Sequence, residues 1–165
     1  MKIKNILVVI LATLMMSVAS VHAKDSEPVK VVYAFDFPDV KRVHFMLNTL
    51  NNLVKHYQET FTDYELSIVL YGPSLQYIMK DFKGTGFARM PYLDHGGPEG
   101  NGVQGRLKAI KQSAGDNMEI FVCQNTMENK NVKPEQLVDY AQTTPGGILK
   151  LIELQHDGAA YIKIK

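Results

Sequence analysis

The chain has 165 residues, of which 18 are basic and 17 are acidic, so its formal net charge is +1. This near balance gives no electrostatic case for binding nucleic acid or an anionic membrane, because both require clustered positive charge. The sequence has one cysteine, which excludes a disulfide within the chain. The length suits one domain with its own hydrophobic core.

The N-terminus has the layout of a secretory signal peptide. Two lysines precede an uncharged apolar run over residues 6–18, and residues 21–23 place small side chains where signal peptidase reads them. We predict that residues 1–23 are removed and that the mature domain, residues 24–165, is periplasmic. The alternative is an uncleaved membrane anchor, but the apolar run is shorter than the roughly 20 residues of a spanning helix. No later segment is long and apolar enough to span a bilayer, so we expect no membrane attachment after cleavage.

The first half of the mature domain is predicted to alternate strand and helix. Residues 29–37 and 64–72 are rich in β-branched and aromatic side chains, which is typical of strands. Between them, residues 40–59 carry apolar side chains at helical spacing, and Asp39 is suited to cap this helix. A Gly-Pro break follows the second strand and precedes a short helix predicted over residues 74–80.

The middle of the chain is rich in glycine. Residues 83–105, the glycine-rich segment, hold seven of the 12 glycines. We predict a long loop here, with a short extended piece at residues 87–93, and long loops in compact domains are often functional. Apolar residues at helical spacing then predict a helix that begins near residue 103 and ends at Gly115.

The last part of the chain completes an alternating pattern. We predict a strand over residues 118–123, helices over residues 134–141 and 148–156, and a final strand over residues 159–165. Alternation of strands and helices indicates an α/β fold, a three-layer α/β/α sandwich with a mostly parallel sheet.

Four residues are candidates for a site at the carboxyl edge of this sheet. Asp36, Tyr71 and Cys123 each stand at a predicted strand end, where open α/β sheets form their ligand sites. His95 lies in the glycine-rich segment and could approach the same crevice. Asp36 and His95 also have ordinary alternatives: Asp36 could cap the first helix, which is the interpretation we favour, and His95 could be a solvated loop residue.

Two motif matches fail on their context. Residues 100–105 fit the G-x-G-x-x-G pattern, but no strand precedes them and the next strand ends in cysteine rather than in an acidic residue. Residues 72–76 resemble a nucleophile elbow but lack its second glycine. The histidines have no metal-ligand spacing, and one cysteine cannot form a zinc-ribbon set. We therefore expect neither a cofactor nor a metal.

The lone cysteine, Cys123, ends a predicted strand in the stretch "EIFVCQNTM". Exported proteins usually pair their cysteines, so an unpaired one is a packed side chain, an intermolecular partner or a reactive thiol. If a helix or turn starts directly after it, free N–H groups near Asn125 and Thr126 would point at the sulfur and favour the thiolate. A thiolate is a nucleophile that can accept and pass on sulfur.

A family resemblance rests on five segments of the chain: "VVYAFDF", "LNTLNNL", "IVLYGPSL", "FVCQNTM" and "GGILKLIELQHDGAAYIKI". In this order they resemble the DsrE/DsrF-like superfamily over nearly the whole mature chain. The resemblance implies a mostly parallel α/β fold related to flavodoxin-like folds, often assembled into trimers or hexamers. Better-known members carry persulfide on a cysteine that corresponds to Cys123, and Asn125 and Thr126 correspond to motif neighbours without an established role.

Together with the predicted export signal, the resemblance implies a periplasmic sulfur carrier or sulfurtransferase-like protein that acts through Cys123 with a sulfur donor or acceptor protein. Two features depart from the sulfur-relay members: those are cytoplasmic, and an alanine-rich stretch follows their cysteine. One alternative is a non-enzymatic module that binds a small ligand or a protein through the crevice and the glycine-rich segment, with a structural cysteine. Another is a subunit whose purpose is its oligomer. Whether the protein is an enzyme stays open.

Overall fold

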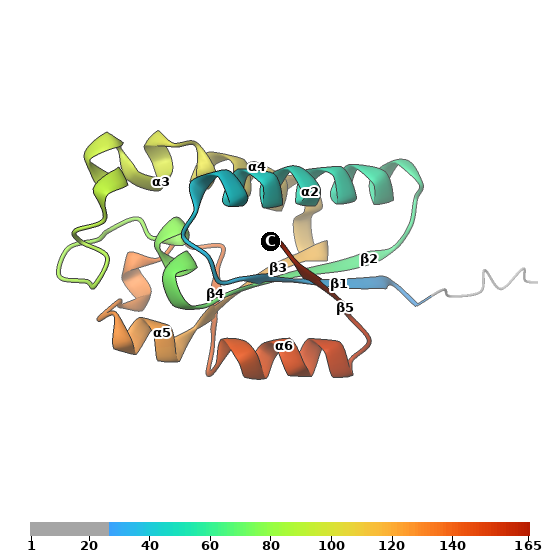
Figure 1. The fold of residues 1–165 in the computed structure, drawn as a ribbon. Coiled ribbons are helices and arrows are strands. Elements are labelled where there is room, and N and C mark those ends of the chain that lie inside the picture. The colour runs from blue at the N-terminus through green and yellow to red at the C-terminus, as the bar shows by residue number, and fades with distance from the viewer. Residues whose placement is uncertain (1–26) are drawn as a thin grey trace, which may run out of the picture.

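The computed structural model describes residues 27–165, apart from the side chains of Pro91 and Tyr92. The predicted signal peptide, residues 1–23, lies outside the described residues. The described chain forms a five-stranded parallel sheet in the order β4-β3-β2-β1-β5, with helices on both faces (Figure 1). This arrangement confirms the predicted three-layer α/β/α sandwich. Its layers are those of flavodoxin-like folds, although the flavodoxin strand order is 2-1-3-4-5.

The three central strands are almost continuously apolar, because helices cover both faces of the sheet there. The edge strands β4 and β5 are short and more polar. The strands are β1 (Val29–Phe35), β2 (Tyr64–Leu70), β3 (Met118–Cys123), β4 (Gln142–Thr144) and β5 (Ala160–Lys163).

The helices differ greatly in length. Those of the α type are α2 (Val40–Glu59), α3 (Gly97–Gly100), α4 (Val103–Ala114), α5 (Gln124–Asn129) and α6 (Gly147–His156). Shorter 3-10 helices span Gly72–Ile78, Pro91–His95, Gly115–Asn117 and Pro134–Gln136. No helix among residues 27–165 is long and apolar enough to cross a bilayer.

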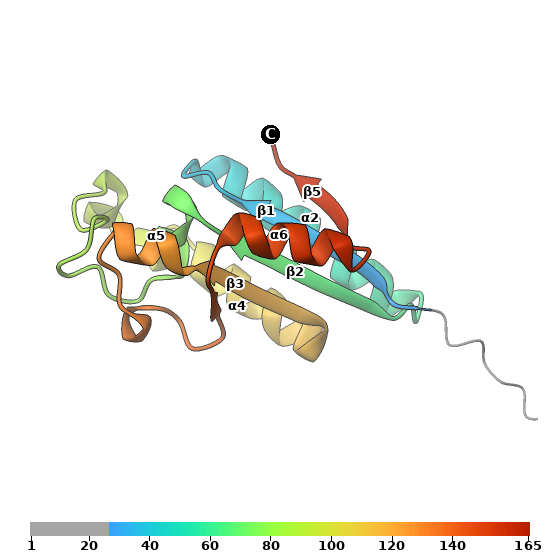
Figure 2. The same ribbon diagram turned by 90° about the horizontal axis from the view of Figure 1, so that it is seen from below.

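The two faces of the sheet carry separate hydrophobic clusters. Helices α2 and α4 bury their apolar stripes on one face, and Asp39 caps α2 as predicted by accepting a hydrogen bond from the Arg42 N–H at 2.8 Å. On the other face, α6 lies across β1, β2 and β3 and covers a much smaller cluster (Figure 2). The first face therefore supplies most of the buried apolar area.

The connections after β2 and β3 leave the sheet toward opposite faces. The chain after β2 leads to α3 and α4 on the α2 side, whereas the chain after β3 enters α5 on the α6 side (Figure 1). Adjacent strands that diverge in this way open a crevice at their carboxyl ends, which is where α/β sheets bind ligands. The topology thus places Cys123, the last residue of β3, at the edge of this crevice.

Two predicted elements are wrong. Residues 87–93 are not extended, because turn hydrogen bonds such as Met90 N–H to the Phe87 carbonyl lead into the 3-10 helix Pro91–His95. The helix predicted over residues 134–141 stops at Gln136, and the strand β4 follows it. That strand is three polar residues long and is defined by its backbone pairing with β3, so hydrophobic periodicity gave no signal for it.

Candidate functional site

Cys123 is buried but belongs to neither hydrophobic cluster. It ends β3, its exposed fraction is 6%, and it is the residue before the first turn of α5. Alternation along the strand turns Cys123 to the same face as Phe121, which packs under α6. The thiol therefore lies on the lightly covered face, beside polar backbone groups.

Hydrogen-bond donors around the sulfur lower the pKa of the Cys123 thiol from its ordinary value of 9.0. Burial acts in the opposite direction, because desolvation disfavours the thiolate. The hydroxyl of Thr126 and the backbone N–H groups of Gly147, Thr126 and Asn125 outweigh it. The predicted helix directly after the cysteine is present as α5, and the backbone N–H groups of its residues Asn125 and Thr126 contribute to the lowered pKa.

Thr126 is oriented by the chain after β2. Its Oγ1 accepts a hydrogen bond from the Gly72 N–H at 2.9 Å. A hydroxyl has one proton, and this contact occupies a lone pair of the oxygen, so the proton remains available to the sulfur. Gly72 has φ of +60°, a conformation that favours glycine, and this turn aims its N–H across the crevice.

The N-terminus of α6 provides a further hydrogen-bond donor near the sulfur. Gly147, its first residue, contributes the N–H that acts on the sulfur, and β4 pairs Thr144 with Cys123 just before this helix begins. A Cβ at position 147 would lie 2.8 Å from Cβ of Tyr71, so the helix approaches closely only because residue 147 is glycine. The positive end of the α6 dipole adds to the stabilisation of a thiolate.

Tyr71, Asp36 and Lys163 form a polar group at the same edge of the sheet. The Tyr71 hydroxyl donates to Oδ2 of Asp36 at 3.4 Å, and Nζ of Lys163 lies 3.7 Å from the same oxygen. Burial, followed by the charge of Asp36, raises the pKa of Tyr71 to about 12, so its hydroxyl remains a donor at neutral pH. The favoured interpretation of Asp36 as a helix cap is wrong, since Asp39 caps α2.

Comparison with known proteins identifies the family and supports the fold. Residues 32–164 match the DsrE/DsrF-like family. The chain belongs to the DsrE/DsrF-like family. A search of curated proteins gave no match. Among solved structures, the protein of unknown function MTH1491 from Methanobacterium thermoautotrophicum is similar in fold, with a TM-score of 0.60 and 18% identity over 82% of this chain and 98% of that one.

Within this DsrE/DsrF-like domain, His95 is not part of the Cys123 site. It is exposed in the 3-10 helix Pro91–His95, on the α3 side of the sheet, and makes no hydrogen bond to Cys123, Asp36 or Tyr71. Asn125 contributes its backbone N–H, whereas its side chain is exposed. The residues that the structure describes contain no cluster of three metal-ligating side chains.

Sequence reasoning missed Gly72, Gly147 and Lys163. The run Pro145-Gly146-Gly147 at the start of a predicted helix could have pointed to Gly147, because two glycines allow a helix N-terminus to approach a ligand closely. Nothing in the sequence linked Lys163 to Asp36, since that contact depends on β5 pairing with β1 at the far end of the chain.

Proposed function

We propose that the protein is a periplasmic sulfur carrier that holds a persulfide on Cys123. One observation carries the proposal: although burial raises the pKa of the Cys123 thiol, the Thr126 hydroxyl and the backbone N–H groups of Gly147, Thr126 and Asn125 lower it overall. A cysteine that served only as packing would have apolar neighbours, which raise the pKa of a thiol. Membership of the DsrE/DsrF-like family supports a role in sulfur relay.

In the proposed transfer, the Cys123 thiolate attacks the outer sulfur of a donor persulfide, R–S–SH. The S–S bond of the donor breaks, a new S–S bond of about 2.05 Å forms to Cys123, and the donor leaves as the thiolate R–S⁻. One thiolate and one persulfide stand on each side, so no external oxidant is needed. The outgoing step repeats this exchange with an acceptor thiolate and regenerates Cys123.

The site would stabilise both anionic forms of the carrier, the Cys123 thiolate and the persulfide anion. The donors that stabilise the Cys123 thiolate would also act on a terminal persulfide anion beside the N-termini of α5 and α6. The added sulfur extends about 2 Å beyond a sulfur that is nearly covered, which would bring the transferable atom toward the acceptor.

Intact mass spectrometry tests the carrier function. Folded protein is treated with polysulfide, or with thiosulfate plus a sulfurtransferase, and weighed without reductant beside Cys123→Ser. We expect sulfur additions on the wild type only. If the wild type gains no sulfur and Cys123 resists alkylation until the protein is denatured, Cys123 is a packing residue and the proposal is wrong.

The periplasmic location is part of the proposal and rests on the predicted signal peptide. N-terminal sequencing of the exported protein should start at or near Lys24. Recovery of the full-length chain in the inner membrane would contradict it.

We also propose a homo-oligomer, a trimer or hexamer, on the strength of the family resemblance. Exposed apolar side chains on α6 suit such an interface, since Ile148, Leu149 and Ile152 are each more than half exposed. Light scattering across micromolar concentrations should show an assembly that Ile152→Asp weakens. A monomer throughout this range would refute the proposal.

A further inference from the structure

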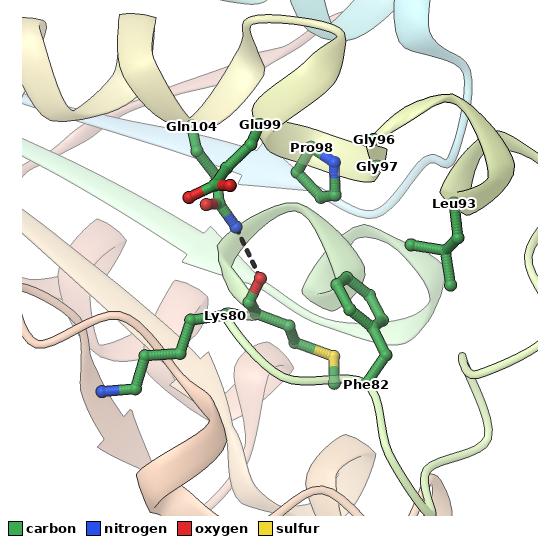
Figure 3. A pocket seen from close by; sticks show the side chains of 9 residues that line it. Lys80, Phe82, Leu93, Gly96, Gly97, Pro98, Glu99 and Gln104 are labelled. Carbon is green, nitrogen blue, oxygen red and sulfur yellow. Dashed lines mark hydrogen bonds between the residues drawn. The ribbon is translucent and has the colours of Figure 1, made fainter.

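A cavity of about 370 Å³ lies between the chain that follows the 3-10 helix Gly72–Ile78 and the α3–α4 segment (Figure 3). None of its residues belongs to the Cys123 site. Its lining combines one apolar side with a few polar side chains: Met79, Lys80, Phe82, Leu93, Gly96, Gly97, Pro98, Glu99 and Gln104. A volume of this size is in the range of small-molecule sites.

The apolar side of the cavity suits a hydrocarbon or aromatic group. Met79, Phe82, Leu93 and Pro98 supply it, and Figure 3 shows the side chains of Phe82, Leu93 and Pro98 around the same space. The glycines at positions 96 and 97 add no side chains to fill it. A ligand that occupied this space would bury apolar surface and gain affinity from that burial.

Gln104 is a buried polar group without a complete set of partners. Its exposed fraction is 8%, and its Nε2 donates to the Met79 carbonyl at 2.6 Å. This contact fixes which end of the amide is nitrogen, so Oε1 is the free end, and it has no donor among residues 27–165. Oε1 is not among the fully buried side-chain atoms without a partner, so it is open to the cavity and can accept a hydrogen bond from a donor on a ligand.

Glu99 presents a second acceptor. Its side chain reaches from α3 toward the cavity, and its carboxylate forms no ion pair within the described part of the chain (Figure 3). The nearest cation in the lining, Lys80, lies with its Nζ 3.8 Å from Asp139 and extends away from the apolar walls (Figure 3). A carboxylate beside an amide oxygen matches an ammonium group, which carries charge and three donors.

A second cavity of about 340 Å³ shares Lys80, Glu99 and Gln104 with the first. Its further lining includes Lys108 of α4 and Asp139. Asp139 is engaged by Lys80, whereas Lys108 has no ion-pair partner among the described residues. An anionic group next to the ammonium would therefore meet a free cation.

We propose that these two cavities form one binding site for an α-amino acid with an apolar side chain. The apolar side chain occupies the cavity lined by Phe82 and Leu93. The ammonium group donates to Glu99 and to Oε1 of Gln104, and the carboxylate faces Lys108. This site is independent of sulfur chemistry at Cys123, from which it differs in every residue.

Titration of the exported protein followed by NMR tests the site, in the Cys123→Ser background so that the thiol takes no part. The probe is L-phenylalanine. The matched probes are phenethylamine, which lacks the carboxylate, and 3-phenylpropanoate, which lacks the ammonium. Probes of this size bind in the millimolar range, so titrations run to about 30 mM. We expect saturable shifts of the Gly96, Gly97 and Gln104 signals, with phenylalanine tightest of the three.

Variants that remove one charge then test which residue binds the ammonium group and which binds the carboxylate of the ligand. Glu99→Gln should weaken phenylalanine and phenethylamine at least about tenfold and leave 3-phenylpropanoate unchanged. Lys108→Gln should weaken phenylalanine and 3-phenylpropanoate and leave phenethylamine unchanged. Glu128→Gln, an exposed change on α5, should alter none of the three. The proposal would be overturned if no probe gave a saturable shift or if all three bound with equal affinity. It would also be overturned if Glu99→Gln weakened 3-phenylpropanoate, or Lys108→Gln weakened phenethylamine.

Discussion

The two faces of the sheet divide stability and chemistry between them. On one face, α2 and α4 close over a large cluster that includes Phe35, Leu50 and Leu107. On the other face, α6 alone covers a small cluster around Leu151, and its outer side leaves apolar side chains in solvent. Cys123 turns to this second face, where the backbone N–H groups of Gly147, Thr126 and Asn125 lower the pKa of its thiol.

The difference shows how a buried thiol can be activated. The heavily packed face would surround it with methyl groups and raise its pKa. The lightly packed face instead places the N-termini of α5 and α6 beside it, and the pKa falls. The cost is a weaker core on that side, so the two faces should respond differently to mutation.

The largest expected effect is on stability, and it should differ between the hydrophobic clusters on the two faces. Leu50→Ala on the α2 face should lower the free energy of unfolding by about 2–5 kcal/mol, because Leu50 is fully buried in the large cluster. Leu151→Ala should cost at least about 1 kcal/mol less, since fewer neighbours line the space it leaves. Urea denaturation of both variants measures the difference. Equal costs would mean that the cluster under α6 is packed as tightly as the one on the other face.

The next largest effect is expected at Gly147, where one substitution should change both the stability and the pKa of Cys123. Gly147→Ala places a Cβ against Tyr71 and displaces the N–H that acts on the sulfur. We expect a loss of about 1–3 kcal/mol in stability and a raised pKa of Cys123. Iodoacetamide alkylation followed over pH should show the midpoint moved to higher pH.

Gly105→Ala is the matched control for that variant. Gly105 lies inside α4, and a Cβ there would meet no atom within 4 Å. Alanine should stabilise the helix by up to about 1 kcal/mol and leave the alkylation profile unchanged. If both glycine variants shift the profile alike, the effect at Gly147 is not local to the sulfur.

A smaller effect isolates the hydroxyl of Thr126. Thr126→Val keeps the shape but removes the donor to the sulfur and the acceptor for the Gly72 N–H. The pKa of Cys123 should rise, so alkylation at neutral pH should slow several-fold, and stability should fall by about 1–3 kcal/mol because the Gly72 N–H loses its partner. Thr126→Ser retains the hydroxyl and should react like the wild type. A valine variant that reacts as fast as the wild type would mean that the Thr126 hydroxyl does not act on the sulfur.

Much of the fold was predictable because its signals are local. The apolar spacing from residue 40 to 59 and from residue 103 onward predicted two helices, and the runs at residues 29–37 and 118–123 predicted strands. The strand β4 was missed because its three polar residues form a strand only through pairing with β3. Local patterns do not report such tertiary pairing.

The site was predictable only in part. Cys123 and Tyr71 followed from the rule that ligands meet the carboxyl ends of strands, and Thr126 followed from its place after the cysteine. The N–H of Gly147 reaches the sulfur from 24 positions further along the chain, through the β4 crossover, and no spacing rule expresses that. Asp36 was placed correctly at the edge, but its partner Lys163 comes from the last strand.

The smallest effect is the pH dependence of stability that comes from Cys123. Its pKa is lower in the folded protein, so the unfolded chain binds more protons between the two pKa values and stability rises with pH there. This contribution is complete above the ordinary thiol value of 9.0 and is lost as pH falls through the folded pKa. The free energy of unfolding of the wild type minus that of Cys123→Ser should therefore increase up to about pH 9 and then level off. Other groups that titrate in this range are present in both proteins, so the difference isolates the contribution of Cys123. A flat difference over this range would mean that the donors on the α6 face do not stabilise a thiolate, and the contrast between the two faces would be one of packing alone.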